Sequence, residues 1–222
     1  MRRIVGILTL ALLPGALSAQ PAGLTVDKDK KAVIIAAKVA PRKLADPKFE
    51  GKIYPVEVVA CWAYPKGQKA HETVLTFDVK PSEIHKALES LGLKPGKPVY
   101  GDTEEKATGP ELKLYVEATV DGDTRKTPIE RTMLDPRTGK AIKNLKWIFT
   151  GSVMSKVAAD KDEMAYGADL TGTLIAIFPV TNQTVIQTNL TMKEEKYLKI
   201  ETNEKVLPKV GTDVKLIIEA AK

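Results

Sequence analysis

The sequence predicts an α+β fold that is rich in β-strands, with mostly antiparallel pairing and one main helix at about residues 81–91. Two observations favour this class. Most apolar residues occur in short runs or in alternation, which are the patterns of buried and half-buried strands. In one segment the apolar residues instead recur at helical spacing. Many strands with one helix packed on a sheet face are typical of an α+β domain.

Eight segments have strand character. Some are short apolar runs rich in β-branched and aromatic residues, and others alternate between apolar and polar side chains. In one of them Leu75, Phe77 and Val79 fall on a single face. The predicted strands are residues 31–38, 53–64, 72–79, 112–120, 146–153, 170–178, 184–188 and 214–219.

The predicted helix has a start signal, a stop signal and one apolar stripe. Pro81 suits the first helical position, and Gly92 suits the residue that ends a helix. Ile84, Leu88 and Leu91 lie on one face between them. We therefore expect this face to pack on the sheet, with His85 at the edge of the apolar stripe because it lies about 100° from Ile84.

The first 19 residues have the order of a secretory signal peptide. Arg2 and Arg3 are followed by an apolar run at residues 4–13, and Ala19 places a small residue before Gln20. The apolar run is shorter than the roughly 20 residues that span a bilayer. We predict a signal peptide at residues 1–19, a single β-rich domain at residues 20–222, and a periplasmic or secreted protein with no membrane span after cleavage.

The charge of the chain does not favour a nucleic-acid partner. There are 34 basic and 28 acidic residues, and the net charge of +6 becomes +4 without Arg2 and Arg3. Most of the basic residues are lysines interleaved with acids, whereas nucleic-acid readers favour the planar arginine fork. We interpret the charge as a solvated surface. A weaker alternative is a lysine-rich surface that binds acidic cell-envelope polymers.

The candidate site residues are Cys61, His71, Glu72 and His85. They include the one cysteine and both histidines of the chain, and they fall within one strand–loop–strand–helix segment. Thiolate, imidazole and carboxylate are the ligand types that bind zinc or copper. A thiol beside an imidazole is also how a nucleophilic cysteine is activated. A lone cysteine excludes an intrachain disulfide scaffold.

The expected geometry separates the thiol from the first histidine. Residues 65–70 suit a hairpin loop that pairs Tyr64 with His71 in an antiparallel register. Cys61 and His71 then lie on opposite faces, which argues against a Cys–His nucleophile. Two alternatives stay open for Cys61: it is either a small buried hydrophobic residue or part of a metal or ligand site.

The segment from Cys61 to Pro98 resembles the YdjY-domain family of bacterial proteins. In that family a Cys, a Gly-Lys loop and a His-Glu pair precede a Lys-Pro-Ser helix that ends in Leu-Gly. The matching residues are Cys61, Gly67, Lys69, His71-Glu72, Lys80-Pro81-Ser82 and Leu91-Gly92. Further matches are Trp147, Gly151-Ser152, Tyr166, Ala168-Asp169, Gly172, Glu201-Thr202-Asn203, Pro208 and Gly211-Thr212.

The resemblance implies an exported bacterial protein without an established reaction. Some members of the family are associated with iron–sulfur ferredoxin modules. This chain has one cysteine, so we expect no iron–sulfur cluster in it. The resemblance adds weight to Cys61, His71 and Glu72 as a family pattern, without naming a ligand.

The sequence therefore predicts an exported, non-catalytic module that binds a ligand or partner, here an unidentified cell-envelope protein or ligand. No nucleophile elbow, dinucleotide fingerprint, Cys-x-x-Cys pair or calcium loop occurs in the chain. The alternative is a metal-binding or redox accessory protein. It would hold a divalent transition metal with Cys61, His71 and Glu72, and with His85 nearby.

Overall fold

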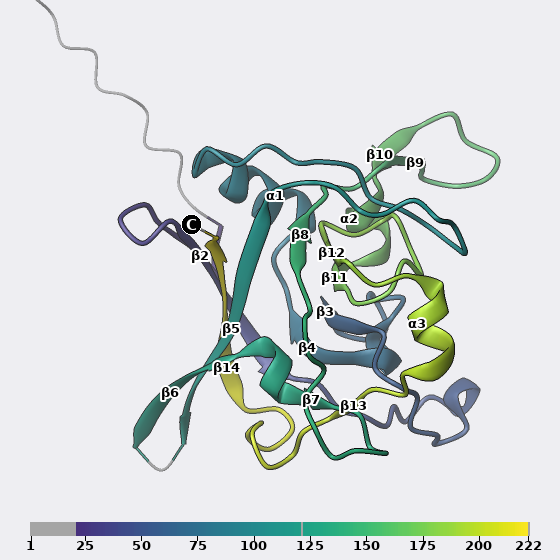
Figure 1. Ribbon diagram of the computed structural model, residues 1–222. Helices are drawn as coiled ribbons and strands as arrows, with labels where there is room; N and C mark the ends of the chain where they lie inside the picture. The colour runs from purple at the N-terminus through teal and green to yellow at the C-terminus, as the bar shows by residue number, and fades with distance from the viewer. Residues whose placement is uncertain (1–20, 121, 222) are drawn as a thin grey trace, which may run out of the picture.

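The main sheet of this protein closes on itself into a barrel of eight strands, as the computed structural model shows for residues 21–120 and 122–221 (Figure 1). The predicted signal peptide, residues 1–19, lies outside the described residues. Around the barrel the strands are β2 (Ala32–Val39), β14 (Asp213–Ala220), β5 (Glu111–Val120), β8 (Trp147–Phe149), β12 (Ile186–Thr188), β11 (Thr173–Ala176), β3 (Val58–Trp62) and β4 (Thr73–Phe77).

Strand β2 closes the ring because it has different partners along its length. One edge of β2 pairs with β14 from Ala32 to Lys38. The other edge pairs with β1 (Leu24–Asp27) in its first half and with β4 in its second half, where Ala37 lies opposite Phe77. Because β1 is the first and β14 the last strand of the described part, the first and last strands of the fold meet at β2.

The remaining elements extend or cover the barrel. Strand β6 (Asp123–Pro128) pairs with the far half of β5, and the hairpin that they form projects from the barrel (Figure 1). Two small sheets pair β9 (Met154–Lys156) with β10 (Met164–Tyr166) and β7 (Met133–Leu134) with β13 (Glu201–Thr202). The helices are α1 (Pro81–Ser90), α2 (Gly167–Thr171) and α3 (Met192–Tyr197), with 3-10 turns at Pro47–Phe49, Ala70–Glu72 and Ile129–Thr132.

The hydrophobic core fills the barrel from alternate positions of its strands. Val33 and Ile35 of β2, Leu216 of β14 and Leu114 of β5 are buried on the inner face, while the residues between them face outward. Ile84 and Leu88 of α1 are also fully buried in this core. No helix in the described part of the chain is long and apolar enough to cross a membrane.

The predicted class is confirmed in its coarse form. The fold is β-rich and mostly antiparallel, and α1 at Pro81–Ser90 matches the predicted helix. All eight predicted segments contain a strand, although three of the strands, β3, β8 and β11, are much shorter than expected. In residues 53–64 the strand begins at Val58, after Pro55, which has no N–H for a ladder. In residues 170–178 the first residues belong to α2, which ends at Gly172 in the left-handed conformation. The closure of the barrel was not predicted.

The predicted hairpin between β3 and β4 is wrong, because the two strands are parallel. Ala60 lies opposite Leu75, and Trp62 lies opposite Phe77. The chain does not turn back at residues 65–70. It folds over the sheet instead and returns to the start of β3, where the Glu57 N–H donates to the Glu72 carbonyl at 3.2 Å. Strand β4 therefore begins at the same end of the sheet as β3.

Candidate functional site

The connection between β3 and β4 is held by an ion cluster that we call the Lys69 clamp, formed by Glu57, Lys69 and Glu72. The Lys69 Nζ lies 2.8 Å from Glu72 Oε2 and 3.2 Å from Glu57 Oε2. The two acids come directly before β3 and β4, and Lys69 comes from the connection between these strands. The lysine therefore bridges the N-terminal ends of the two parallel strands.

Burial and charge shape the protonation of the clamp. Burial, together with the negative charge of Glu72, raises the pKa of Glu57 above its ordinary value. Burial disfavours the charged form of Lys69, but the hydrogen bonds and charges of Glu72 and Glu57 outweigh it and raise the pKa of the ammonium group. The lysine therefore stays charged and compensates two carboxylates that are largely removed from water.

His71 lies beside the clamp in an aromatic setting. Its Nε2 is 3.1 Å from Glu72 Oε1, and its ring centroid lies 4.8 Å from that of Phe49 and 5.0 Å from that of Tyr54. The Nδ1 atom is buried and has no hydrogen-bond partner among the described residues. Burial, with the charge of Lys69 next, lowers the pKa of His71. The imidazole is therefore held in its neutral form beside a carboxylate.

Cys61 is packed beneath the same connection, away from solvent. Its side chain is fully buried, and its Sγ lies 3.9 Å from the carbonyl oxygen of Thr171. Gly67 of the connection lies so close to Cys61 and Trp62 that a Cβ there would be 1.9 Å from the Trp62 carbonyl oxygen. Burial raises the pKa of the Cys61 thiol, which favours an inert packed thiol over a reactive thiolate.

His85 belongs to a separate polar network on α1. Its Nδ1 lies 2.6 Å from the Tyr166 hydroxyl, which accepts a hydrogen bond from the Ser152 N–H at 3.1 Å. The phenol therefore donates to the imidazole, whose Nε2 lies 3.5 Å from the Glu89 carboxylate. Burial lowers the pKa of His85 and raises that of Tyr166. This network of side chains runs from the largely buried phenol of Tyr166, through His85, to the half-exposed carboxylate of Glu89.

The structure thus divides the four predicted site residues. His71 and Glu72 are in contact, Cys61 lies beneath the connection, and His85 sits with Tyr166. Within residues 21–120 and 122–221, no group of three or more His, Cys, Asp or Glu side chains is arranged to hold a metal ion. The metal and redox hypotheses stay predictions. Two residues that were not predicted are added to the candidate site: Glu57, which binds Lys69, and Tyr166, which binds His85.

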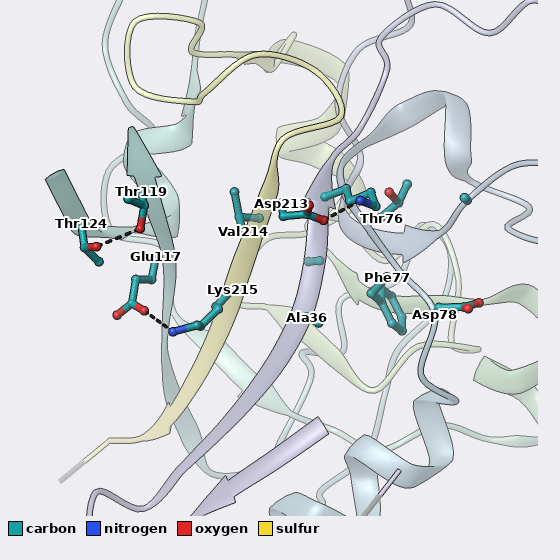
Figure 2. Close-up of a pocket in the computed structure, with 13 residues that line it drawn as sticks. Ala36, Thr76, Phe77, Asp78, Glu117, Thr119, Thr124, Asp213, Val214 and Lys215 are labelled. Carbon is teal, nitrogen blue, oxygen red and sulfur yellow. Dashed lines mark hydrogen bonds and ion pairs between the residues drawn. The ribbon is translucent and has the colours of Figure 1, made fainter. Parts of the chain in front are cut away.

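A wide cavity on the outer face of the barrel is the second candidate site, and we call it the outer groove. It has a volume of about 770 Å³ and crosses β4, β2, β14, β5 and β6 (Figure 2). The lining residues are Ala36, Ala37, Lys38, Ala63, Thr76, Phe77, Asp78, Glu117, Thr119, Thr124, Asp213, Val214 and Lys215.

Polar side chains of the outer groove pair across neighbouring strands. Lys215 reaches Glu117 on β5 at 2.8 Å, as Figure 2 shows, and Thr119 lies 2.8 Å from Thr124 on β6. Lys38 pairs in the same way with Asp213, which lies directly opposite it. Each pair follows the strand register, so the sheet itself sets the geometry of the groove.

A family model identifies the chain. The model of the YdjY domain matches residues 24–219, which covers most of the sequence. The chain belongs to the YdjY-domain family. No curated protein and no solved structure matches it. The resemblance seen in the sequence is thereby confirmed.

Many of the residues that carry the YdjY resemblance lie at two places in the fold. Gly67, Lys69 and His71-Glu72 form the connection over β3. The second place lies around α1, where Asp169 of α2 accepts hydrogen bonds from the Ser82 N–H at 2.8 Å and the Ser82 hydroxyl at 2.6 Å. Asp169 thus caps the first turn of α1, and Tyr166 binds His85 one turn further on. In this YdjY domain the matched segments therefore position both histidines.

The lowered pKa values of His71 and His85 predict that the YdjY domain loses stability as the pH falls. The unfolded chain takes up protons at a pH near 6.5, before the folded protein does, so the free energy of unfolding decreases through this range and levels off below the folded pKa values. We expect a His71→Gln/His85→Gln double variant to have a flatter slope between about pH 7 and pH 5 in urea denaturation.

A Lys28→Gln variant provides the control, since Lys28 is exposed and lies far along the chain from both histidines. Glu57 acts in the opposite direction, because its raised pKa makes the folded state take up a proton first as the pH falls. It is present in all three proteins, so the comparison isolates the histidines. A double variant with the wild-type slope would contradict the prediction.

Proposed function

We propose that this YdjY domain is an exported, non-catalytic module that binds a ligand or partner in the outer groove. The observation that carries the proposal is the pairing of charges inside that cavity. Of its five charged lining residues, Lys38, Asp213, Glu117 and Lys215 neutralise each other across strands. A groove of about 770 Å³ with compensated charges suits an uncharged or zwitterionic molecule.

The shape and rigidity of the outer groove support a binding role. Its floor is made of small side chains, of which Ala36 and Thr76 lie on the outer face of neighbouring strands. The strands of the floor are hydrogen-bonded on both edges within the closed barrel, so the surface is formed before a ligand arrives. A preformed site avoids the ordering cost that a flexible one would incur on binding.

Solvent mapping by NMR tests the outer groove directly. We expect isopropanol and N-methylacetamide to shift the amide signals of Ala36, Thr76 and Thr119 at lower concentrations than other amides, because small probes collect in preformed concave sites. An Ala36→Trp variant fills the floor with a residue that strands tolerate, and it should abolish these shifts.

The matched control is Ala159→Trp, which adds the same side chain to an exposed position in the turn between β9 and β10. This variant should keep the wild-type pattern. Shifts scattered over the whole surface, or an unchanged pattern in Ala36→Trp, would exclude the groove as the binding site. Turnover in hydrolase or oxidoreductase assays would exclude the non-catalytic role.

Export rests on the order of residues at the start of the chain. When the full sequence is expressed in a bacterium, we expect the mature protein in the periplasmic or secreted fraction, beginning near Gln20, because the leader has the order that signal peptidase recognises. Mass spectrometry of the intact protein measures this. A full-length protein retained in the cytoplasm would contradict it.

A further inference from the structure

A second cavity lies on the opposite face of β5, and we call it the basic pocket. It has a volume of about 770 Å³, and its lining residues come from the β5–β6 hairpin, the 3-10 turn after β6 and the loop that precedes β14. Its lining includes Val116, Val120, Arg125, Arg131, Lys205 and Val206.

The basic pocket exists because β5 is longer than the barrel needs. Strand β5 pairs with β14 only as far as Glu117, and beyond that residue it pairs with β6 alone. The last inward-facing residues of β5 therefore have β6 on one edge of the strand and no β14 residue paired on the other edge. The loop opposite is fixed in place, since the Asn203 N–H donates to the Thr132 carbonyl at 2.8 Å.

The floor of the basic pocket is apolar and partly open to solvent. Val116 and Leu207 are buried beneath it, while Val120 is 45% exposed and Val206 is 40% exposed. Two exposed valines from segments far apart in the sequence thus line one depression. Exposed apolar surface gathered in a cavity, with polar residues around it, is typical of a ligand site.

The rim of the basic pocket is positively charged. Arg125, Arg131 and Lys205 line it against a single carboxylate among the described lining residues, Asp123. Asp123 lies 3.8 Å from Arg125, and both side chains are largely exposed, so this pair contributes little. No ion pair with another described residue occupies Arg131 or Lys205. Arg125 and Arg131 both line this cavity, and a guanidinium group suits bidentate binding of a carboxylate or phosphate.

We propose that the basic pocket binds an amphipathic anion, an aliphatic chain that ends in an oxyanion. The chain would lie on Val120 and Val206, and the oxyanion would meet Arg125 and Arg131. The proposal does not depend on the outer groove, because the two cavities use alternate residues of β5. Glu117 and Thr119 face the groove, while Val116, Ala118 and Val120 face the pocket.

Calorimetric titration with decanoate below its micellar concentration tests the proposal. We expect decanoate to bind at one site, with acetate at least tenfold weaker because it lacks the chain, and decyltrimethylammonium also weaker than decanoate because its charge is reversed. Arg131→Gln should weaken decanoate binding by about tenfold through loss of a charged hydrogen bond. Decyl phosphate compares the two oxyanions, and tighter binding of either one supports the proposal.

Two matched controls separate the site from general effects. Arg137→Gln removes an arginine that pairs with Asp135 outside the pocket, and it should leave decanoate binding unchanged. Val120→Asp places a carboxylate on the floor and should abolish binding, whereas Val157→Asp makes the same change at an exposed valine after β9 and should not. Ala36→Trp should also have no effect, so a failure of the outer groove is distinguishable.

The proposal is overturned by any of three results. Both decanoate and decyl phosphate could fail to bind the wild-type protein, or decanoate could bind Arg131→Gln as tightly as wild type. Equal binding of decanoate and decyltrimethylammonium would show attraction to the chain alone. Each of these results excludes recognition of an anionic head group in this pocket.

Discussion

The bridge from Lys69 to Glu57 and Glu72 is the interaction on which the architecture depends. It fixes the connection after β3 so that the chain returns to the start of that strand. Strand β4 can then pair in parallel with β3 on one edge and with β2 on the other. Without this placement the sheet would have two open edges, and closure is what removes such edges in β-proteins.

The closed sheet also creates both cavities. Because β2 and β14 are held edge to edge with their neighbours, cross-strand pairs such as Lys215–Glu117 line up and leave a shallow floor between them. Because β5 extends beyond the end of its pairing with β14, its last inward-facing residues lie outside the barrel and form the floor of the basic pocket. A single long strand therefore separates a charge-compensated groove from a positively charged pocket.

Local elements of this fold were predictable, and long-range pairings were not. The helix at Pro81–Ser90 follows from its start, its stop and the spacing of Ile84 and Leu88, all of which are local signals. The parallel pairing of β3 and β4 requires, besides the Lys69 bridge, a close approach of Gly67, which fits against the Trp62 carbonyl only because it has no side chain. In the sequence, residues 65–70, which include Gly67, have the composition of a hairpin loop. Composition alone does not distinguish a turn from a connection that folds over a strand.

The candidate site was predictable in its residue types but not in its grouping. Glu72 and His71 are adjacent in the sequence, so their contact could be predicted. Tyr166 meets His85 across 81 residues, and no periodic pattern reports such a contact. The positive charge was interpreted as a solvated surface because lysines and acids alternate along the chain. Arg125, Arg131 and Lys205 nevertheless line one pocket, since β6 and the loop before β14 face each other.

Hydrogen–deuterium exchange of a Lys69→Met variant tests the central role of the clamp. Loss of the bridging charge leaves two largely buried carboxylates together, which should open the edges of β3 and β4 first. The account predicts that amides in Val58–Trp62 and Thr73–Phe77 exchange at least about tenfold faster than in wild type, while the β14–β5 pairing keeps its protection. Lys199→Met, at an exposed lysine near Glu195, should resemble wild type. Unchanged exchange in β3 and β4, or an equal increase in every strand, would contradict the account.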